Sequence, residues 1–97
     1  MYIQTMIDED ILVNEDIDVA IDSLFDKQIV VYNDDVNSFD HVIICFMKYC
    51  GHEWLQAEQC ATIIHNNGKC SVKKGPFSKL RPICEALLDN GLIAKIE

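Results

Sequence analysis

The four glycines of the chain divide residues 29–97 into short segments. Each glycine follows a run with a regular apolar pattern, and glycine readily adopts the left-handed backbone conformation in which helices and tight turns end. A neighbouring proline or asparagine strengthens three of these breaks. Such a chain is restricted to a small fold of short elements, and no apolar run approaches the length of a membrane span. The breaks are Gly51, Gly68, Gly75-Pro76 and Asn90-Gly91.

Three of the segments predict β-strands. Residues 29–33 read IVVYN, and this concentration of β-branched residues favours a short buried strand. In residues 69–74, Cys70 and Val72 alternate with polar residues, as in a strand with one exposed face. Residues 92–96 read LIAKI and predict a last strand.

Two segments between these strands predict amphipathic helices. Residues 38–50 follow a good N-cap, Asn37 or Ser38, and carry apolar residues at helical spacing. A second helix is expected over residues 53–66, where the same spacing recurs. The two apolar stripes are Phe39, Val42, Ile43 and Phe46, and Trp54, Ala57, Ala61 and Ile64.

A third helix is expected to begin with Ser78 as its cap and to end before Asn90, which places Pro82 near its first turn. The predicted order of elements is therefore β-α-α-β-α-β. This order predicts an α+β fold in which three helices pack on one face of a small, three-stranded antiparallel sheet. The predicted buried face of the third helix consists of Leu80, Ile83, Cys84, Leu87 and Leu88.

The charge of the chain is concentrated at its N-terminus. Residues 1–28 contain eight acidic side chains and one basic one, and they carry −7 of the total net charge of −8. We interpret residues 1–28 as an acidic N-terminal extension and residues 29–97 as the folded core domain. Because an acidic chain repels phosphate backbones, we expect no nucleic-acid partner. The N-terminus also lacks the basic stretch of a secretory signal.

The cysteine pattern favours a reduced, cytoplasmic protein. The number of cysteines is odd, no Cys-x-x-Cys spacing occurs, and free cysteine commonly serves as a small apolar core residue. Nothing in the sequence requires more than a monomer or suggests a membrane partner. The cysteines are Cys45, Cys50, Cys60, Cys70 and Cys84.

Metal binding and catalysis are disfavoured by residue spacing. Cys50, His52, Cys60 and His65 are the candidates for a zinc site, but their spacing does not match that of zinc fingers. The sequence contains no recognisable nucleophile with a base and an orienting third group, and no phosphate-binding loop. We therefore expect no metal, no cofactor and no enzymatic activity.

Asn33, Asp34 and Asp35 stand between the first predicted strand and the first predicted helix. Acidic residues at such a position often only form the turn and interact with the helix dipole. Here Asn37 can cap the helix alone, so two acids and an amide exceed what the turn needs. Acids beside an apolar face favour the binding of an ammonium group next to a hydrophobic pocket. His65 could complete a polar ring if the fold brings it close.

Two separated motifs occur in the order and at the spacing of one known family. The first is Tyr32-Asn33-Asp34-Asp35-Val36-Asn37-Ser38-Phe39, followed by Val42, and the second runs from Ala57-x-Gln59 to Ile64-His65-x-x-Gly68-Lys69. They resemble the Asn-Asp-Asp hallmark, and the helix ending in His-x-x-Gly-Lys, of ClpS, the adaptor of the bacterial Clp protease. The resemblance covers about residues 28–97, and the acidic segment occupies the place of the variable ClpS extension.

The resemblance implies a function. ClpS binds N-degrons, which are substrates whose first residue is Leu, Phe, Tyr or Trp, and hands them to a Clp AAA+ unfoldase, of the ClpA or ClpC type, for degradation. On this pattern Asn33, Asp35 and His65 would hold the free α-amino group, and Asp34 would support them. The residues that would line the pocket for the first side chain are Asn37, Phe39, Val42, Ala61, Ile64 and Leu92.

The resemblance is weaker in two respects. Phe39 and Ala61 stand where methionine is common in the family, so the preference among the four side chains stays open. Lys79 is the only residue that the resemblance assigns to docking on the unfoldase. A positive patch that either serves docking or is an ordinary solvated surface comprises Lys73, Lys74, Lys79 and Arg81.

An alternative is a protein-interaction module without degron binding. The predicted order of elements also resembles the C-terminal domain of the ribosomal stalk protein, which binds translation factors. The segment CEALLDNGLIAKIE fits that domain almost as well as it fits ClpS. The stalk domain, however, gives no reason for Asn33, Asp34 and Asp35 to occur together with His65.

Overall fold

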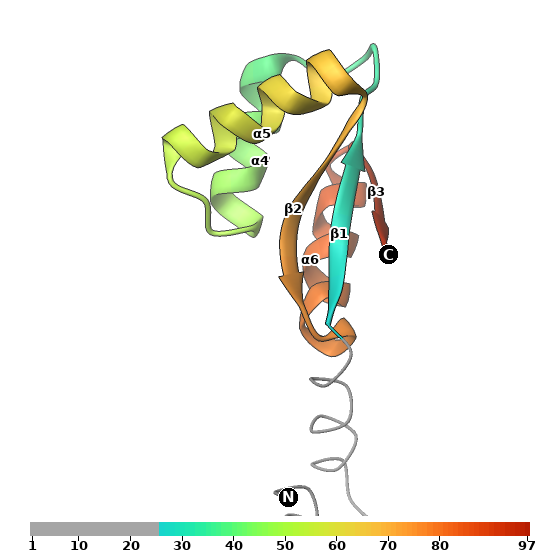
Figure 1. The fold of residues 1–97 in the computed structure, drawn as a ribbon. Coiled ribbons are helices and arrows are strands. Elements are labelled where there is room, and N and C mark those ends of the chain that lie inside the picture. Colours follow the sequence, from blue (N-terminus) through green and yellow to red (C-terminus); the bar gives the residue numbers. More distant parts are fainter. Residues whose placement is uncertain (1–25) are drawn as a thin grey trace, which may run out of the picture.

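The structure is a computed structural model in which residues 26–97 are described. They form a small sheet and three helices (Figure 1). The predicted order and the α+β class are thus confirmed. The predicted extension, residues 1–28, lies outside the described residues except for its last three, and two of these already belong to the first strand. The elements are β1 (Lys27–Tyr32), α4 (Phe39–Tyr49), α5 (Trp54–Asn67), β2 (Lys69–Gly75), α6 (Phe77–Asp89) and β3 (Ile93–Ile96).

β1 is the central strand of an antiparallel sheet with the order β2-β1-β3. Ile29, Val30 and Val31 are buried, which agrees with the β-branched run that predicted this strand. Val31 lies opposite Cys70 of β2 and Ala94 of β3. Because β1 is central, its end leads directly from the core into the Asn-Asp-Asp segment.

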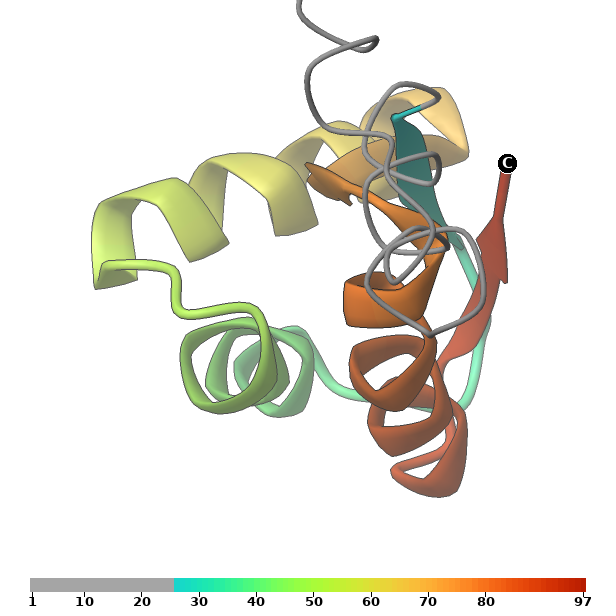
Figure 2. The ribbon, with the colours of Figure 1, turned by 90° about the horizontal axis from the view of Figure 1, so that it is seen from below.

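The helices cover the sheet from one side and from one end. α6 lies along one face of the sheet, and α4 lies beside α6 on that side (Figure 2). α5 runs past the end at which β1 stops and β2 begins (Figure 1). Phe46 of α4 is almost fully buried together with Leu80 and Leu87 of α6, and each such side chain contributes about 1.5–3 kcal/mol to stability. Within residues 26–97, none of the helices has the length and apolar character needed to cross a membrane.

The start of α6 differs from the prediction. The helix begins at Phe77 with Pro76 as its N-cap, so the proposal that Ser78 caps it is wrong. Pro76 has φ −71° and ψ 151°, the extended conformation of an N-cap, and its carbonyl accepts the N–H of Leu80 at 3.1 Å. Proline fixes φ near the helical value, so it can start the helix without a side-chain cap. Pro82 consequently lies in the second turn rather than the first.

Two residues of the predicted apolar faces that lie outside the cavity are half exposed. Trp54 is 53% exposed at the start of α5, and Leu88 is 49% exposed near the end of α6. Both lie at helix ends, outside the stretches whose residues are buried against the core. Periodicity identifies the apolar side of a helix, but it does not show how far along the helix the neighbouring elements extend.

His52 fastens the loop between α4 and α5 to β2. Its ring is buried, lies 5.6 Å from the ring of Phe46, and donates from Nε2 to the carbonyl of Val72 at 2.7 Å. Lys73 adds a second contact, because its Nζ donates to the carbonyl of Cys50 at 3.1 Å. His52, one of the zinc candidates, is therefore a structural residue that positions α5 against the sheet.

We expect His52→Ala to lower the free energy of unfolding by about 2–4 kcal/mol, because the variant leaves a cavity and an unpaired buried carbonyl at Val72. Urea unfolding followed by circular dichroism measures this change. The control is Glu53→Ala, since Glu53 is exposed and makes no side-chain cap, and it should change stability by less than about 0.5 kcal/mol. Similar losses in the two variants would contradict the structural role of His52.

Candidate functional site

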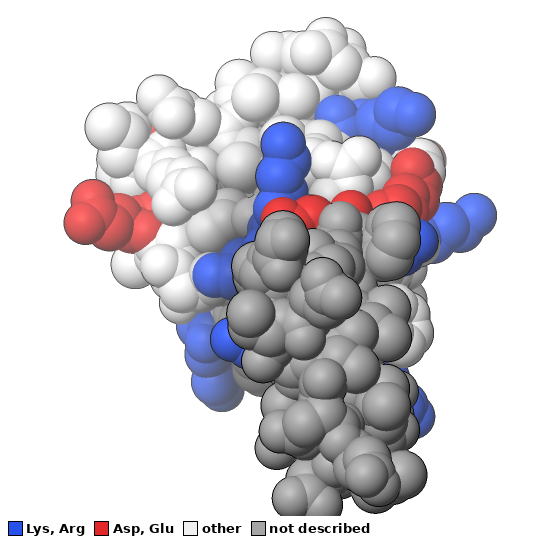
Figure 3. Space-filling model, turned by 60° about the horizontal axis from the view of Figure 1, so that its bottom comes forward, with Lys and Arg blue, Asp and Glu red and all other residues white. Residues whose placement is uncertain are grey.

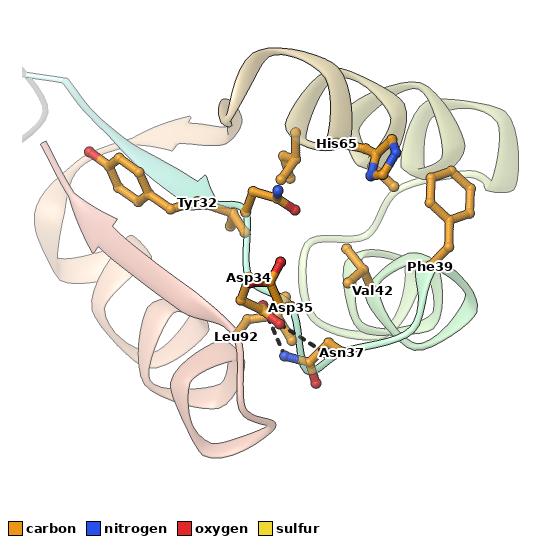
Figure 4. Close-up of a pocket in the computed structure, with 12 residues that line it drawn as sticks. Tyr32, Asp34, Asp35, Asn37, Phe39, Val42, His65 and Leu92 are labelled. Atoms are coloured by element: carbon orange, nitrogen blue, oxygen red, sulfur yellow. Dashed lines mark hydrogen bonds between the residues drawn. The ribbon is translucent and has the colours of Figure 1, made fainter.

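A cavity of about 500 Å³ opens where β1, α4, α5 and β3 meet. Figure 4 shows it between the two aspartates on one side and Phe39, Val42 and His65 on the other. All ten residues that were predicted to bind substrate line this one cavity. Sequence reasoning did not include the other two lining residues, Val31 and Tyr32. The ten predicted residues are Asn33, Asp34, Asp35, Asn37, Phe39, Val42, Ala61, Ile64, His65 and Leu92.

One backbone hydrogen bond brings the two sequence motifs together. The N–H of Asn33, the first residue after β1, donates to the carbonyl of Gly68 at 2.8 Å. Gly68 ends α5 in the left-handed conformation with φ 94°, and its own N–H bonds to Ile64. The last turn of α5, with His65, is thereby placed beside the Asn-Asp-Asp segment.

Asp34 holds the loop that follows β1. Its Oδ1 accepts the backbone N–H groups of Val36 and Asn37, both at 2.8 Å, and its Oδ2 accepts from Nδ2 of Asn37 at 3.0 Å. Partial burial alone would raise the pKa of Asp34, but the hydrogen bonds from Asn37 and Val36 outweigh it and lower the pKa below the ordinary 3.8. Both oxygens of Asp34 are thus occupied within the loop itself.

This loop and the first turn of α4 both contact the turn between α6 and β3. Nδ2 of Asn37 donates to the carbonyl of Gly91 at 2.8 Å, and Nε2 of His41 donates to the carbonyl of Asn90 at 2.9 Å. These contacts place Leu92, which is buried, in the wall of the cavity. Sequence reasoning missed His41, because nothing in its local pattern indicates a partner 49 residues away.

The cavity also has apolar walls. Ala61 and Ile64 of α5 are buried, and so is Leu92, just before β3, whereas Phe39 is 43% exposed at the start of α4. The ring of Tyr32 contributes little to the wall of the cavity, because it points away along the sheet (Figure 4). Its hydroxyl donates to Glu97.

Asp35 and His65 are the exposed ionisable groups of the site. Among residues 26–97, neither side chain has a hydrogen-bond partner, in contrast to Asp34. An open carboxylate, an imidazole and the nearby amide of Asn33 can together accept hydrogen bonds from a primary ammonium group. The apolar walls beside them can hold one hydrophobic side chain.

Cys50 and Cys60, whose pKa values are strongly raised, lie outside the cavity. Burial raises the pKa of Cys50 to about 11, and burial with the neighbouring Cys70 raises that of Cys60 to about 12, so both thiols are protonated at neutral pH and are poor nucleophiles. Within residues 26–97, no three His, Cys, Asp or Glu side chains are grouped so that they could hold a metal ion.

Comparison with known proteins identifies the family. The family model described as "ATP-dependent Clp protease adaptor protein ClpS" matches residues 26–94. The chain is also 35% identical over 66 residues to the "ATP-dependent Clp protease adapter protein ClpS" of Thermosynechococcus vestitus, which covers 67% of this chain and 70% of that protein. The chain therefore belongs to the ClpS family of Clp protease adaptors, which are not proteases themselves and act with the Clp protease chaperone. These matches favour ClpS over the ribosomal-stalk alternative.

We expect Asp34→Asn to lower the free energy of unfolding at pH 7 by about 1 kcal/mol, because an amide cannot accept from both the backbone and Asn37. Asp35→Asn, the control, should change it by less than about 0.5 kcal/mol. Unfolding in urea at several pH values measures both.

The pH dependence has a definite sign. The pKa of Asp34 is lower in the folded chain than in the unfolded chain, so its carboxylate stabilises the fold above pH 3.8 and this contribution is lost as the pH falls through the folded value. The stability difference between the parent and Asp34→Asn should therefore shrink below pH 4. A stability difference that stays constant down to pH 3 would contradict this role of the Asp34 carboxylate.

Proposed function

We propose that this ClpS-family protein binds N-degrons in the cavity, through a free α-amino group and a first side chain of Leu, Phe, Tyr or Trp, and delivers them to a Clp AAA+ unfoldase of the ClpA or ClpC type. The observation that carries the proposal is the composition of the cavity. Open hydrogen-bond acceptors and apolar side chains line the same cavity, with Asp35 across from His65, Phe39 and Val42.

The polar groups of the cavity suit an α-amino group. The carboxylate of Asp35, the side-chain oxygen of Asn33 and the imidazole of His65 would accept its three N–H donors. Charge-assisted hydrogen bonds contribute about 1.5–3 kcal/mol each. An internal residue of a protein has no ammonium group, so it would leave the Asp35 carboxylate without a partner and be rejected.

The apolar walls of the cavity suit one large side chain. An aromatic ring buries roughly 150–200 Å², which at about 25 cal/mol per Å² is worth about 4 kcal/mol before losses. Immobilisation of the peptide offsets much of the total, so we expect dissociation constants in the micromolar range. Ala61 contributes only a methyl group to the wall of the cavity on α5, whereas Phe39 contributes a bulky, partly exposed ring. These two residues would set the preference among the four side chains.

Peptide binding tests the proposal directly. A labelled peptide that begins with free Leu or Phe should bind with micromolar affinity in a fluorescence-anisotropy titration, and the same peptide acetylated at its N-terminus should not bind. Asp35→Ala and His65→Ala should each weaken binding about 10- to 100-fold, since each removes one charge-assisted hydrogen bond. Asp40→Ala is the control, because Asp40 is an exposed acid of α4 outside the cavity. Equal affinity for the free and acetylated peptides would refute the proposed amine site.

Docking on the unfoldase is proposed for the exposed side chain of Lys79 on α6. Two members of the expected positive patch have partners inside the chain, since Lys73 donates to Cys50 and Arg81 pairs with Glu85 at 3.3 Å. On the face seen in Figure 3, Lys and Arg side chains form separate groups rather than one continuous patch. Lys79 is therefore proposed to act as a single contact.

Delivery can be separated from binding. We propose that the acidic extension is engaged by the unfoldase during hand-off. A truncation for this test has to stop at residue 25, because Lys27 and Gln28 belong to β1. The truncated protein should bind the degron peptide as the parent does, but should support slower degradation of an N-degron reporter by the Clp protease. Undiminished degradation would refute the role of the extension.

Lys79→Ala tests the proposed contact with the unfoldase. It should leave peptide binding unchanged and weaken binding to the unfoldase several-fold, whereas Lys95→Ala, an exposed lysine of β3, should change neither.

A further inference from the structure

His41 joins two parts of the fold that carry different walls of the cavity. It lies in the first turn of α4, between Phe39 and Val42, which both line the cavity. Its Nε2 lies 2.9 Å from the carbonyl oxygen of Asn90 in the turn between α6 and β3, and Leu92 follows two residues later. His41 is not itself part of the wall, so its contact acts on the cavity through the spacing of these elements.

The ring of His41 is the donor in this contact and is held in place. A carbonyl oxygen can only accept, so the ring carries a proton on Nε2. The buried thiol of Cys45, one turn further along α4, lies 3.6 Å from the same nitrogen. The backbone N–H of His41 donates to the hydroxyl of Ser38, the N-cap of α4. The donor is therefore fixed to the start of α4.

The turn that accepts the bond is fixed to α6. Asn90 and Leu92 both donate their backbone N–H to the carbonyl of Leu87 at 3.1 Å. Nδ2 of Asn90 adds a bond to the carbonyl of Ala86 at 2.8 Å. Leu92 is thereby tied to the end of α6. The bond from His41 consequently sets the position of the first turn of α4 relative to Leu92.

Asn37 contacts the same turn, but its role is mixed. It donates to the carbonyl of Gly91, lines the cavity, and is held by Asp34. A variant at Asn37 would therefore change the wall and the loop as well as the spacing. A variant at His41 changes the spacing alone.

We propose that His41 is a positioning residue that sets the width of the cavity between Leu92 and the first turn of α4, and thereby shifts the preference among first side chains of different size. This inference rests on the proposed binding of N-degrons. Without the donor of His41, the carbonyl of Asn90, which lies at the partly exposed turn, bonds to water instead. A water molecule at this place occupies space between α4 and the turn, so the walls separate and the cavity fits a larger side chain better.

The selectivity of binding tests this role. His41→Met removes the donor but keeps a side chain of similar length, whereas His41→Gln keeps an N–H donor at the end of the side chain. Fluorescence-anisotropy titrations with two peptides, which begin with free Leu and free Trp, give the ratio of their dissociation constants. We expect His41→Met to shift this ratio at least threefold in favour of Trp, and His41→Gln to stay within twofold of the parent. Asp40→Ala, an exposed neighbour in the same turn, is the control and should leave the ratio unchanged.

A loss of stability alone would not produce this pattern. It lowers the amount of folded protein and so weakens the apparent binding of both peptides equally. Both peptides should also still require a free amino group in every variant, because Asp35 and His65 are unchanged. An unchanged ratio in His41→Met, or an equal shift in His41→Gln, would overturn the proposal.

The protonation of the ring provides a measurement that does not depend on peptide binding. The nitrogen-15 NMR spectrum of the neutral His41 ring should show the proton on Nε2, and a ring with its proton on Nδ1 would overturn the contact with Asn90 and the proposal with it. If the parent binds neither peptide, the proposed function fails and the role in selectivity fails with it, whereas the contact between α4 and the turn is still judged by the ring spectrum.

Discussion

The hydrogen bond from the N–H of Asn33 to the carbonyl of Gly68 is the interaction on which the candidate site depends. Such a bond contributes only about 1 kcal/mol to stability, but it fixes position. It joins the residue that leaves the central strand to the residue that ends α5, and so brings Asn33 and His65 to one cavity. The bond is possible because Gly68 adopts φ 94°, where a side chain would be strained.

The two adjacent aspartates have different environments, although the sequence makes them look equivalent. Asp34 points into its own loop and accepts three hydrogen bonds, which organise the turn and, through Asn37, attach it to Gly91. Asp35 is exposed at the cavity and has no such partner among the described residues. A loop that is already ordered by Asp34 can present Asp35 in a fixed place, so a ligand does not have to order it.

The elements could be predicted from the sequence because their signals are local. Apolar periodicity, the β-branched run of β1 and the glycine at the end of α5 depend on neighbours within a few residues. Contacts between distant segments have no such signal. The contacts of Asn37 with Gly91 and of His41 with Asn90 span about fifty residues, and the half exposure of Trp54 depends on where α5 leaves the core. The family motif identified which residues meet, but it did not identify the bonds that hold them.

α5 is attached to the rest of the fold differently from the other walls of the cavity. The loop after β1 and the turn before β3 are held by several hydrogen bonds, and they should move little. α5 is fixed at its ends, by Gly68 and by the loop that His52 fastens to β2, and between them it is held by the packing of small side chains, Ala57 and Ala61. Small side chains leave a helix free to approach its neighbour closely. Ile64 and His65 lie next to the end of α5 that Gly68 fixes, so the imidazole on α5 keeps its place across the cavity from Asp35.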